Sequence, residues 1–264
     1  MSPDLYFALT LIVKMAVTAA FVVAATMTAE RAGPLIGGLV ATLPLGAGPV
    51  YVFFALDHGA PFIAASAVNS LGINSVNVIF ALTYALLAQK RSLLVSQSLA
   101  LAVWVTLAWT VHEIHWSVLL GVGVNIVVLT TCIVLSRRLR HVPIPPVRTY
   151  WYDLALRAGL VAMLVGINVT LSFSIGPAAS GILAVFPIIL ISIQIILHRR
   201  VGGPPTAAVM AHGIVGLIGF ACACVVLHYT AVPLGAAIGL SLALATSVAW
   251  SLIVFSARRR GVAL

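Results

Sequence analysis

The stretch GPLIGGLVATLPLGAGPVYVFFALDHGAP, residues 33–61, has a counterpart in GPAASGILAVFPIILISIQIILHRRVGGP, residues 176–204. The two stretches share glycine or proline at six positions, and each matched pair is 143 residues apart. The pairs are Gly33 and Gly176, Pro34 and Pro177, Gly38 and Gly181, Pro44 and Pro187, Gly59 and Gly202, and Pro61 and Pro204. Because glycine and proline shape the backbone, a shared set without a gap indicates a duplicated structural unit.

The composition places this duplicated unit in a membrane. Hydrophobic residues make up 62% of the 264 residues, charged residues only 7%, and the mean hydropathy is +1.18. A water-soluble fold has too little core to bury so much apolar surface. Apolar runs of about 20 residues, enough to cross a bilayer as helices, recur along the chain without the alternation of barrel strands. The sequence therefore predicts an all-α, polytopic membrane protein that contacts the lipid bilayer.

We expect about nine transmembrane helices, with the N-terminus outside the cell and the C-terminus in the cytoplasm. The predicted spans are 5–29, 34–56, 61–88, 93–111, 116–136, 151–174, 177–197, 205–228 and 231–256. Lysine and arginine gather in the connections after odd-numbered spans, and such residues mark the cytoplasmic side of an inner (plasma) membrane. The net charge of +9 is then explained by orientation and anionic headgroups, so no nucleic-acid partner is required.

The predicted topology makes the duplicated units inverted-topology repeats, because five spans separate the start of one copy from the start of the other. Residues 1–136 form the first repeat with five helices, 137–150 a cytoplasmic loop rich in proline and arginine, and 151–264 the second repeat with four helices. In this organisation the chain resembles small inverted-repeat secondary transporters, including the drug/metabolite type. That resemblance implies transport and supplies no substrate.

Two prolines are the candidate helix kinks. Pro44 and Pro187 lie in the middle of the second and seventh predicted spans. Proline removes a backbone donor, so each helix should kink or break there, and carbonyl groups freed at membrane depth are tolerated where they line a cavity. A packing kink without a role in binding is the alternative.

Polar side chains inside the predicted spans are the candidate substrate ligands. Asn69 and Asn74 lie in the third span, and His212 occupies the position in the eighth span that matches Asn69. Such side chains either bond neighbouring helices or face a wet pathway. We expect Asn69 and His212 to converge near the membrane midplane, on the pseudo-twofold axis between the repeats.

Lys14 and its repeat equivalent Arg157 are two further candidate ligands inside spans. A cation at such depth costs roughly 2.5–3.5 kcal/mol unless it reaches the interface or a counter-charge. Arg157 follows Asp153 by four residues, a spacing that favours an ion pair within a helix. Lys14 has no acid within one turn, so we expect an anionic ligand or a distant partner, with extension to the membrane surface as the alternative.

The predicted function is an inner-membrane secondary transporter for a small organic anion or polar metabolite, which alternates access by rocking its two repeats. The five acidic residues all lie near span ends. Coupling to protons or sodium through a midplane carboxylate is therefore disfavoured, and His212 is the group that could titrate instead.

Two other classes of function stay open at this point. A membrane enzyme or lipid-handling protein could use His112, Glu113 and His115, although a third metal ligand is not evident, and we predict no enzyme activity, metal site or cofactor. A partner subunit without transport activity, or a homodimer, could pack through the small-residue seam of Gly235 and Gly239.

Overall fold

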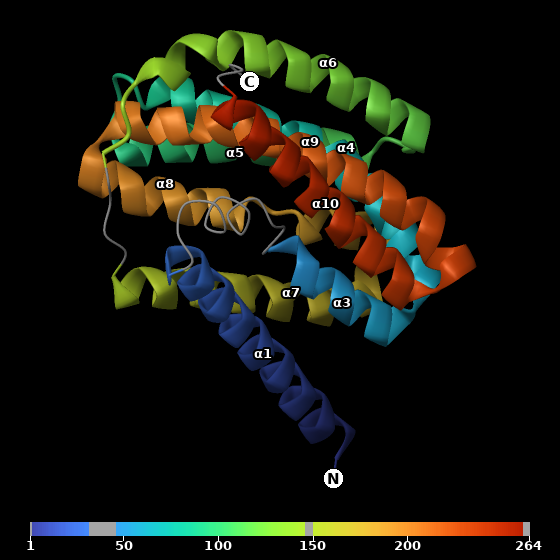
Figure 1. Ribbon diagram of the computed structural model, residues 1–264. Coiled ribbons are helices and arrows are strands. Elements are labelled where there is room, and N and C mark those ends of the chain that lie inside the picture. The colour runs from blue at the N-terminus through green and yellow to red at the C-terminus, as the bar shows by residue number, and fades with distance from the viewer. Residues whose placement is uncertain (1, 32–45, 146–149, 261–264) are drawn as a thin grey trace.

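The computed structural model describes residues 2–31, 46–145 and 150–260, and the regular structure in these ranges is helical (Figure 1). The α-helices are α1 (Pro3–Arg31), α3 (Ala47–His58), α4 (Ala60–Leu87), α5 (Leu93–His112), α6 (Val118–Ser136), α7 (Trp151–Ala184), α8 (Ile188–Val201), α9 (Gly203–Leu234) and α10 (Ala236–Arg259), and a short 3-10 helix covers Arg137–His141. In the described chain, seven helical segments are long and apolar enough to cross a membrane. The protein is a multi-pass helical membrane protein.

Two differences separate these seven segments from the nine predicted spans. The sixth and seventh predicted spans form one 51-residue segment, Trp151–Val201, which holds α7 and α8. The second predicted span is described only from Gly46 onward, and α3 begins at Ala47. The described residues do not include Pro34, Gly38 and Pro44 of this span or Gly33 just before it, so the number of nine spans stays a prediction.

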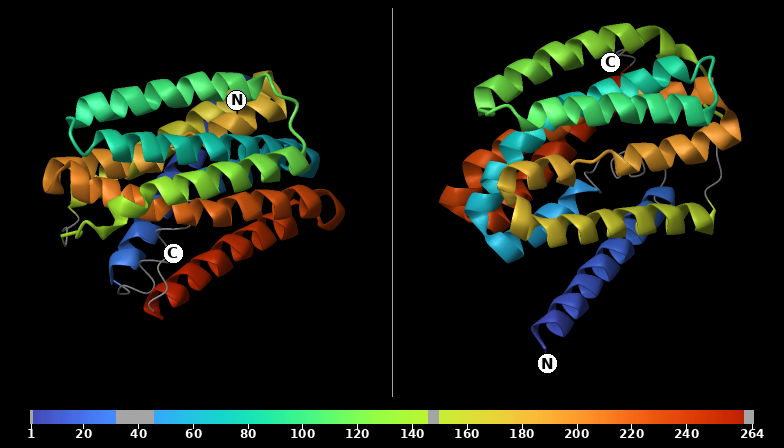
Figure 2. Two further views of the ribbon diagram at one scale, coloured as in Figure 1. Left: turned by 90° about the horizontal axis from the view of Figure 1, so that it is seen from above. Right: turned by 180° about the vertical axis from the view of Figure 1, so that it is seen from behind.

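Helix α4 is the centre of the bundle. It packs against α5, α6, α7 and α9. In its most apolar stretch of 18 residues 78% of the residues are buried, whereas the corresponding fraction for α1 is 11%. Helix α1 packs mainly against α7 and projects away from the other helices, with the N-terminus at its far tip (Figure 2). Its exposed side chains, such as Ile12 and Val13, are apolar, as expected for a surface that meets lipid.

Helices α4 and α9 run antiparallel in contact along most of their length. Ala64, early in α4, accepts a hydrogen bond from His228, late in α9, and the carbonyl of Ala88 occupies the space that a side chain at Gly203 would need. Midway between these contacts, Asn74 donates to the carbonyl oxygen of Leu217 at 3.2 Å. Asn74 and Leu217 are themselves 143 residues apart.

Two of the matched glycines form turns of the same kind. Gly59 joins α3 to α4 with φ 81° and ψ −173°, and Gly202 joins α8 to α9 with φ 84° and ψ 178°. Side chains other than that of glycine are strained in this region. In both cases the next helix carries a proline in its first turn, Pro61 or Pro204, where the missing amide donor costs nothing.

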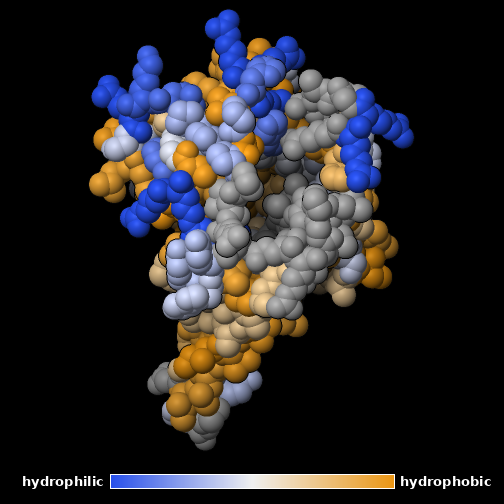
Figure 3. All heavy atoms as spheres, turned by 60° about the vertical axis from the view of Figure 1, so that its left-hand side comes forward, coloured by the Kyte–Doolittle hydropathy of each residue, from blue (hydrophilic) through white to orange (hydrophobic). Residues whose placement is uncertain are grey.

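The described basic loops share one end of the bundle. The α4–α5 connection, the segment after α6 and the α8–α9 turn lie at the left in Figure 1, whereas the α3–α4, α5–α6 and α9–α10 turns lie at the opposite end. We call the first of these the basic end. Figure 3 looks toward the basic end and shows hydrophilic side chains gathered over it, while the projecting α1 is hydrophobic.

Replacing Gly202 tests the backbone argument. Gly202→Ala meets no neighbouring atom, so its cost comes from the positive φ alone, and we expect it to lower stability by about 1–3 kcal/mol. Gly213→Ala, in open space within α9, is the matched control and should be neutral or slightly stabilising. Thermal unfolding in detergent measures both variants, and equal effects would contradict the assignment of strain at Gly202.

Candidate functional site

The seventh predicted span is broken in the structure. Its first part, after the kink at Gly176, ends with α7 at Ala184, and α8 begins only at Ile188. Val185 has φ −105° and ψ 14°, and Pro187 has φ −75° and ψ 42°, so neither continues an α-helix. The break therefore lies at the predicted position, Pro187. Neither of the two cavities described below is lined by Pro187, and its role beside a cavity stays a prediction.

Side chains from α4 and α5 hold the broken segment. Asn77 of α4 donates from Nδ2 to the carbonyl oxygen of Val185 at 2.8 Å, and Trp104 of α5 donates from Nε1 to Oδ1 of Asn77 at 2.6 Å. The ring of Phe186 packs edge-on against Trp104 with 4.9 Å between centroids. A carbonyl group that the break releases is thus satisfied inside the protein.

The candidate ligand Asn74 joins helices instead of facing a cavity. It is fully buried and donates to Oδ1 of Asn125 on α6 at 2.8 Å, as well as to Leu217 on α9. Asn125 in turn donates to the carbonyl oxygen of Leu71 at 2.7 Å. These bonds connect α4, α6 and α9, which is the helix-joining role that polar residues in membrane spans commonly have.

The structure does not bring Asn69 and His212 together, and the expectation that they converge is wrong. The antiparallel register places each of them five residues before the crossing of Asn74 and Leu217, on opposite sides of it. At 1.5 Å per residue, they are separated by roughly 15 Å along the helix pair. Equivalent positions of the two repeats meet only at the crossing of α4 and α9. Asn69 instead donates to the carbonyl oxygen of Ala65 in its own helix.

Lys14 has a distant partner in the form of Asp57. Its ammonium group contacts the two carboxylate oxygens at 2.5 and 2.6 Å, and it lies 5.6 Å from the ring centre of Phe53. The exposed fractions of the two charged side chains are 12% and 14%. The ion pair joins α1 to the last turn of α3, at the end of α3 that is remote from the basic end.

A small cavity borders this ion pair. Its volume is about 210 Å³, and its lining comes from α1, α3 and α7: Tyr6, Phe7, Thr10, Leu11, Lys14, Asp57, Val169 and Phe173. Next to it, His58 shares a hydrogen bond of 2.8 Å with Ser172 and lies between the rings of Phe62 and Phe173. Since sites for drug-sized ligands measure about 300–1,000 Å³, this cavity suits a smaller solute.

A second ion pair lies at the basic end. Arg200, in the last turn of α8, contacts Asp153 of α7 at 2.7 Å, and its guanidinium stacks over the rings of Tyr150 and Tyr152. Asp153 also accepts from the backbone amide of Tyr150 at 2.8 Å, which caps α7. Sequence spacing suggested Arg157 as the partner of Asp153. The structure shows Arg200, which reaches it from the next helix.

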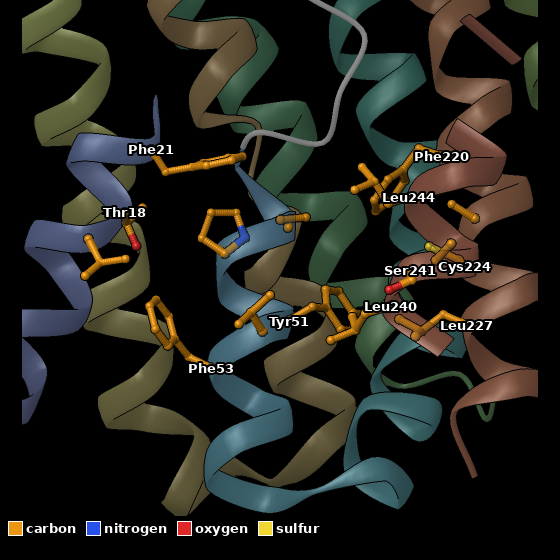
Figure 4. A pocket seen from close by; sticks show the side chains of 17 residues that line it. Thr18, Phe21, Tyr51, Phe53, Phe220, Cys224, Leu227, Leu240, Ser241 and Leu244 are labelled. Atoms are coloured by element: carbon orange, nitrogen blue, oxygen red, sulfur yellow. The ribbon is translucent and has the colours of Figure 1, made fainter. Parts of the chain in front are cut away.

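The larger cavity offers little to a polar solute. It measures about 530 Å³ and lies between α1 and α3 on one side and α9 and α10 on the other (Figure 4). None of the residues that line it is charged. The hydroxyl groups in its lining already form hydrogen bonds. Thr18 and Ser241 donate to the backbone carbonyl groups of Lys14 and Ala237, and the hydroxyl of Tyr51 bonds that of Ser70. Its apolar walls suit hydrocarbon.

The structure gives no support to the two sequence features that suggested a membrane enzyme or a partner subunit. His112, Glu113 and His115 are exposed around the α5–α6 turn, and the described residues contain no cluster of histidine, cysteine, aspartate or glutamate that could hold a metal. Gly239 lies against the backbone of Ala231, so this position of the glycine seam packs α10 on α9 within one chain.

Comparison with known proteins adds no assignment, because no family model, curated protein or solved structure matches this chain. The features of the molecule that bear on its function are the broken helix, the two ion pairs and the cavity beside Lys14 and Asp57. The ion-pair partners were hidden from sequence reasoning because each pair joins two different helices. The only available signal was that Asp57 and Arg200 are themselves 143 residues apart.

Asn77 should matter more for stability than Asn69. Asn77→Leu leaves the carbonyl of Val185 and the indole of Trp104 without their partner, and an unsatisfied buried group costs about 1–3 kcal/mol. Asn69→Leu removes only a bond within one helix turn and should change stability little. Thermal unfolding of the two variants in the same detergent checks this. A larger loss for Asn69→Leu would contradict the account of the break.

Lys14 and Asp57 should couple in a double-mutant cycle. Lys14→Met or Asp57→Asn alone leaves a largely buried charge without its partner, which costs up to about 3–5 kcal/mol at full burial and less here. The double variant should be more stable than the sum of the single losses predicts. Unfolding of all four proteins measures the coupling, and strictly additive losses would show that the pair does not act as a unit.

Proposed function

We propose that the protein is an inner-membrane secondary transporter for a small polar or anionic metabolite, built from two inverted repeats. The observation that carries the proposal is the crossing of α4 and α9 at Asn74 and Leu217, two residues that are 143 positions apart. The turns at Gly59 and Gly202 have the same spacing and the same backbone geometry. A pseudo-twofold axis in the membrane plane accounts for both, and transporters of this construction bind substrate at the repeat interface.

The two ion pairs support a movement that alternates between the ends of the bundle. One links the last turn of the short helix α3 to α1, the other links the last turn of the short helix α8 to α7, and the two pairs lie at opposite ends. In the proposed cycle, one pair loosens while the other holds. The break before α8 gives that helix freedom to tilt, because only three residues, 185–187, separate it from α7.

The proposed orientation follows from the charges. The basic end faces the cytoplasm, since short cytoplasmic loops collect lysine and arginine. The cavity beside Lys14 and Asp57 then lies toward the outside, the side from which we propose that it admits a solute. Its charged wall favours a polar solute over a hydrocarbon, whereas the larger apolar cavity does the reverse.

Pro187 should control transport more than stability. Pro187→Ala restores a backbone donor, so the break can close into helix, and we expect transport to slow by about tenfold while thermal stability is unchanged or higher. The measurement is uptake of radiolabelled metabolites into proteoliposomes, begun with a broad panel on the native protein.

Pro233→Ala is the matched control for Pro187→Ala. Pro233 is an exposed proline near the end of α9, away from the break, and its replacement should leave uptake unchanged. Two results would count against the proposal: no flux of any panel member through the native protein, or equal uptake by both proline variants and the native protein.

A further inference from the structure

We infer that the cavity beside Lys14 and Asp57 binds a dipolar solute, one that carries an ammonium group and a carboxylate or phosphate group only a few bonds apart. This specifies the substrate class of the transporter proposed above and rests on that proposal. The observation behind it is that a cation and a carboxylate in mutual contact border the same cavity of about 210 Å³.

The charge balance of the wall decides between classes of solute. Lys14 and Asp57 are the charged residues in the lining of this cavity, and together they carry no net charge. A simple anion that takes Lys14 leaves Asp57 largely buried without its partner, and a simple cation does the same to Lys14. Breaking a buried pair in this way is strongly unfavourable. A dipolar solute replaces both partners at once, so each protein charge keeps an opposite charge.

The rest of the lining sets size and shape. Besides the two charged groups, the polar side chains of the lining are those of Tyr6 and Thr10, and Thr10 donates its hydroxyl to the backbone carbonyl of Tyr6 in its own helix. Phe7 and Phe173, whose ring centres are 6.5 Å apart, close one side with aromatic surface. The site therefore fits a compact head group with a small apolar portion.

Two sources can supply this chemistry. A free metabolite such as an amino acid carries both charges, and so does the head group of a zwitterionic phospholipid. The second source is relevant because the wall formed by α1 includes Tyr6 and Phe7, which are 64% and 40% exposed on a helix that projects from the bundle. The experiment therefore has one arm for each source.

The test compares four solutes of equal size: alanine as zwitterion, lactate as anion, alaninamide as cation and lactamide as neutral reference. The same four head groups on a leucine skeleton repeat the comparison with a larger apolar part. Binding to the purified full-length protein is read as thermal stabilisation over a concentration series. A parallel arm adds phosphatidylethanolamine, or anionic phosphatidylglycerol, to the detergent micelles.

Within a set of four solutes, we expect the zwitterion to stabilise the protein most. If the lipid is the source instead, phosphatidylethanolamine should stabilise the protein more than phosphatidylglycerol. Asp57→Asn should shift the preference toward the anion and Lys14→Met toward the cation, each weakening the zwitterion by about tenfold, equivalent to 1.4 kcal/mol. The exchanged variant Lys14→Asp with Asp57→Lys keeps an ion pair and should keep the preference for the zwitterion. Arg200→Gln, which disrupts the other ion pair, is the control and should leave the order of preference unchanged.

The inference is overturned if the anion, the cation or the neutral solute binds best to the native protein. It is also overturned if no zwitterionic solute exceeds its neutral reference and phosphatidylethanolamine does not exceed phosphatidylglycerol. It is also overturned if the variants at Lys14 and Asp57 keep the native order. Failure of transport gives a different result: zwitterion binding that depends on Lys14 and Asp57, without flux in proteoliposomes. If the protein transports solutes but the variants at Lys14 and Asp57 do not change its order of preference among them, the transport proposal holds and this binding site is wrong.

Discussion

Backbone hydrogen bonding without water is the constraint on which the rest of this structure depends. In hydrocarbon every amide and carbonyl group must find a partner inside the protein, so a helix can break only where other side chains replace its lost bonds. Here the chain breaks before α8, and Asn77, held by Trp104, binds the carbonyl of Val185. The broken helix therefore requires α4 and α5 at its side, and this requirement fixes how the second half packs on the first.

Helix α4 meets this requirement while serving as the partner of α9. Its polar residues divide the work: Asn77 binds the break, Asn74 binds the crossing with α9, and Ser70 joins the carbonyl of Gly181 on α7 at 2.6 Å. These bonds occupy the buried face of α4, so the proposed cycle places its movement outside α4, in the short helices α3 and α8. Ion pairs at opposite ends attach those helices to α1 and α7. In the proposed transport cycle, α4 is the fixed centre and α3 and α8 are the parts that move.

The sequence predicted backbone features better than contacts between side chains. The helical spans and the break at Pro187 follow from local rules, since hydrophobic run length and a missing amide donor act on a few neighbouring residues. The prediction that Asn69 and His212 converge was wrong, because it depended on the register between α4 and α9, which spacing along the chain does not determine. The partnership of Lys14 and Asp57 was open for the same reason, as the two residues are 43 positions apart.

Side-specific labelling of matched cysteines would test the central claim most directly. Leu11 borders the cavity beside Lys14, and Leu154, its repeat equivalent, lies in the first turn of α7. Single variants Leu11→Cys and Leu154→Cys, in a background without Cys132, Cys222 and Cys224, would be labelled with a membrane-impermeant thiol reagent. The account predicts labelling from opposite sides of the membrane, with rates that change in opposite directions when a transported solute is added. Labelling from one side, or rates that change together, would contradict it.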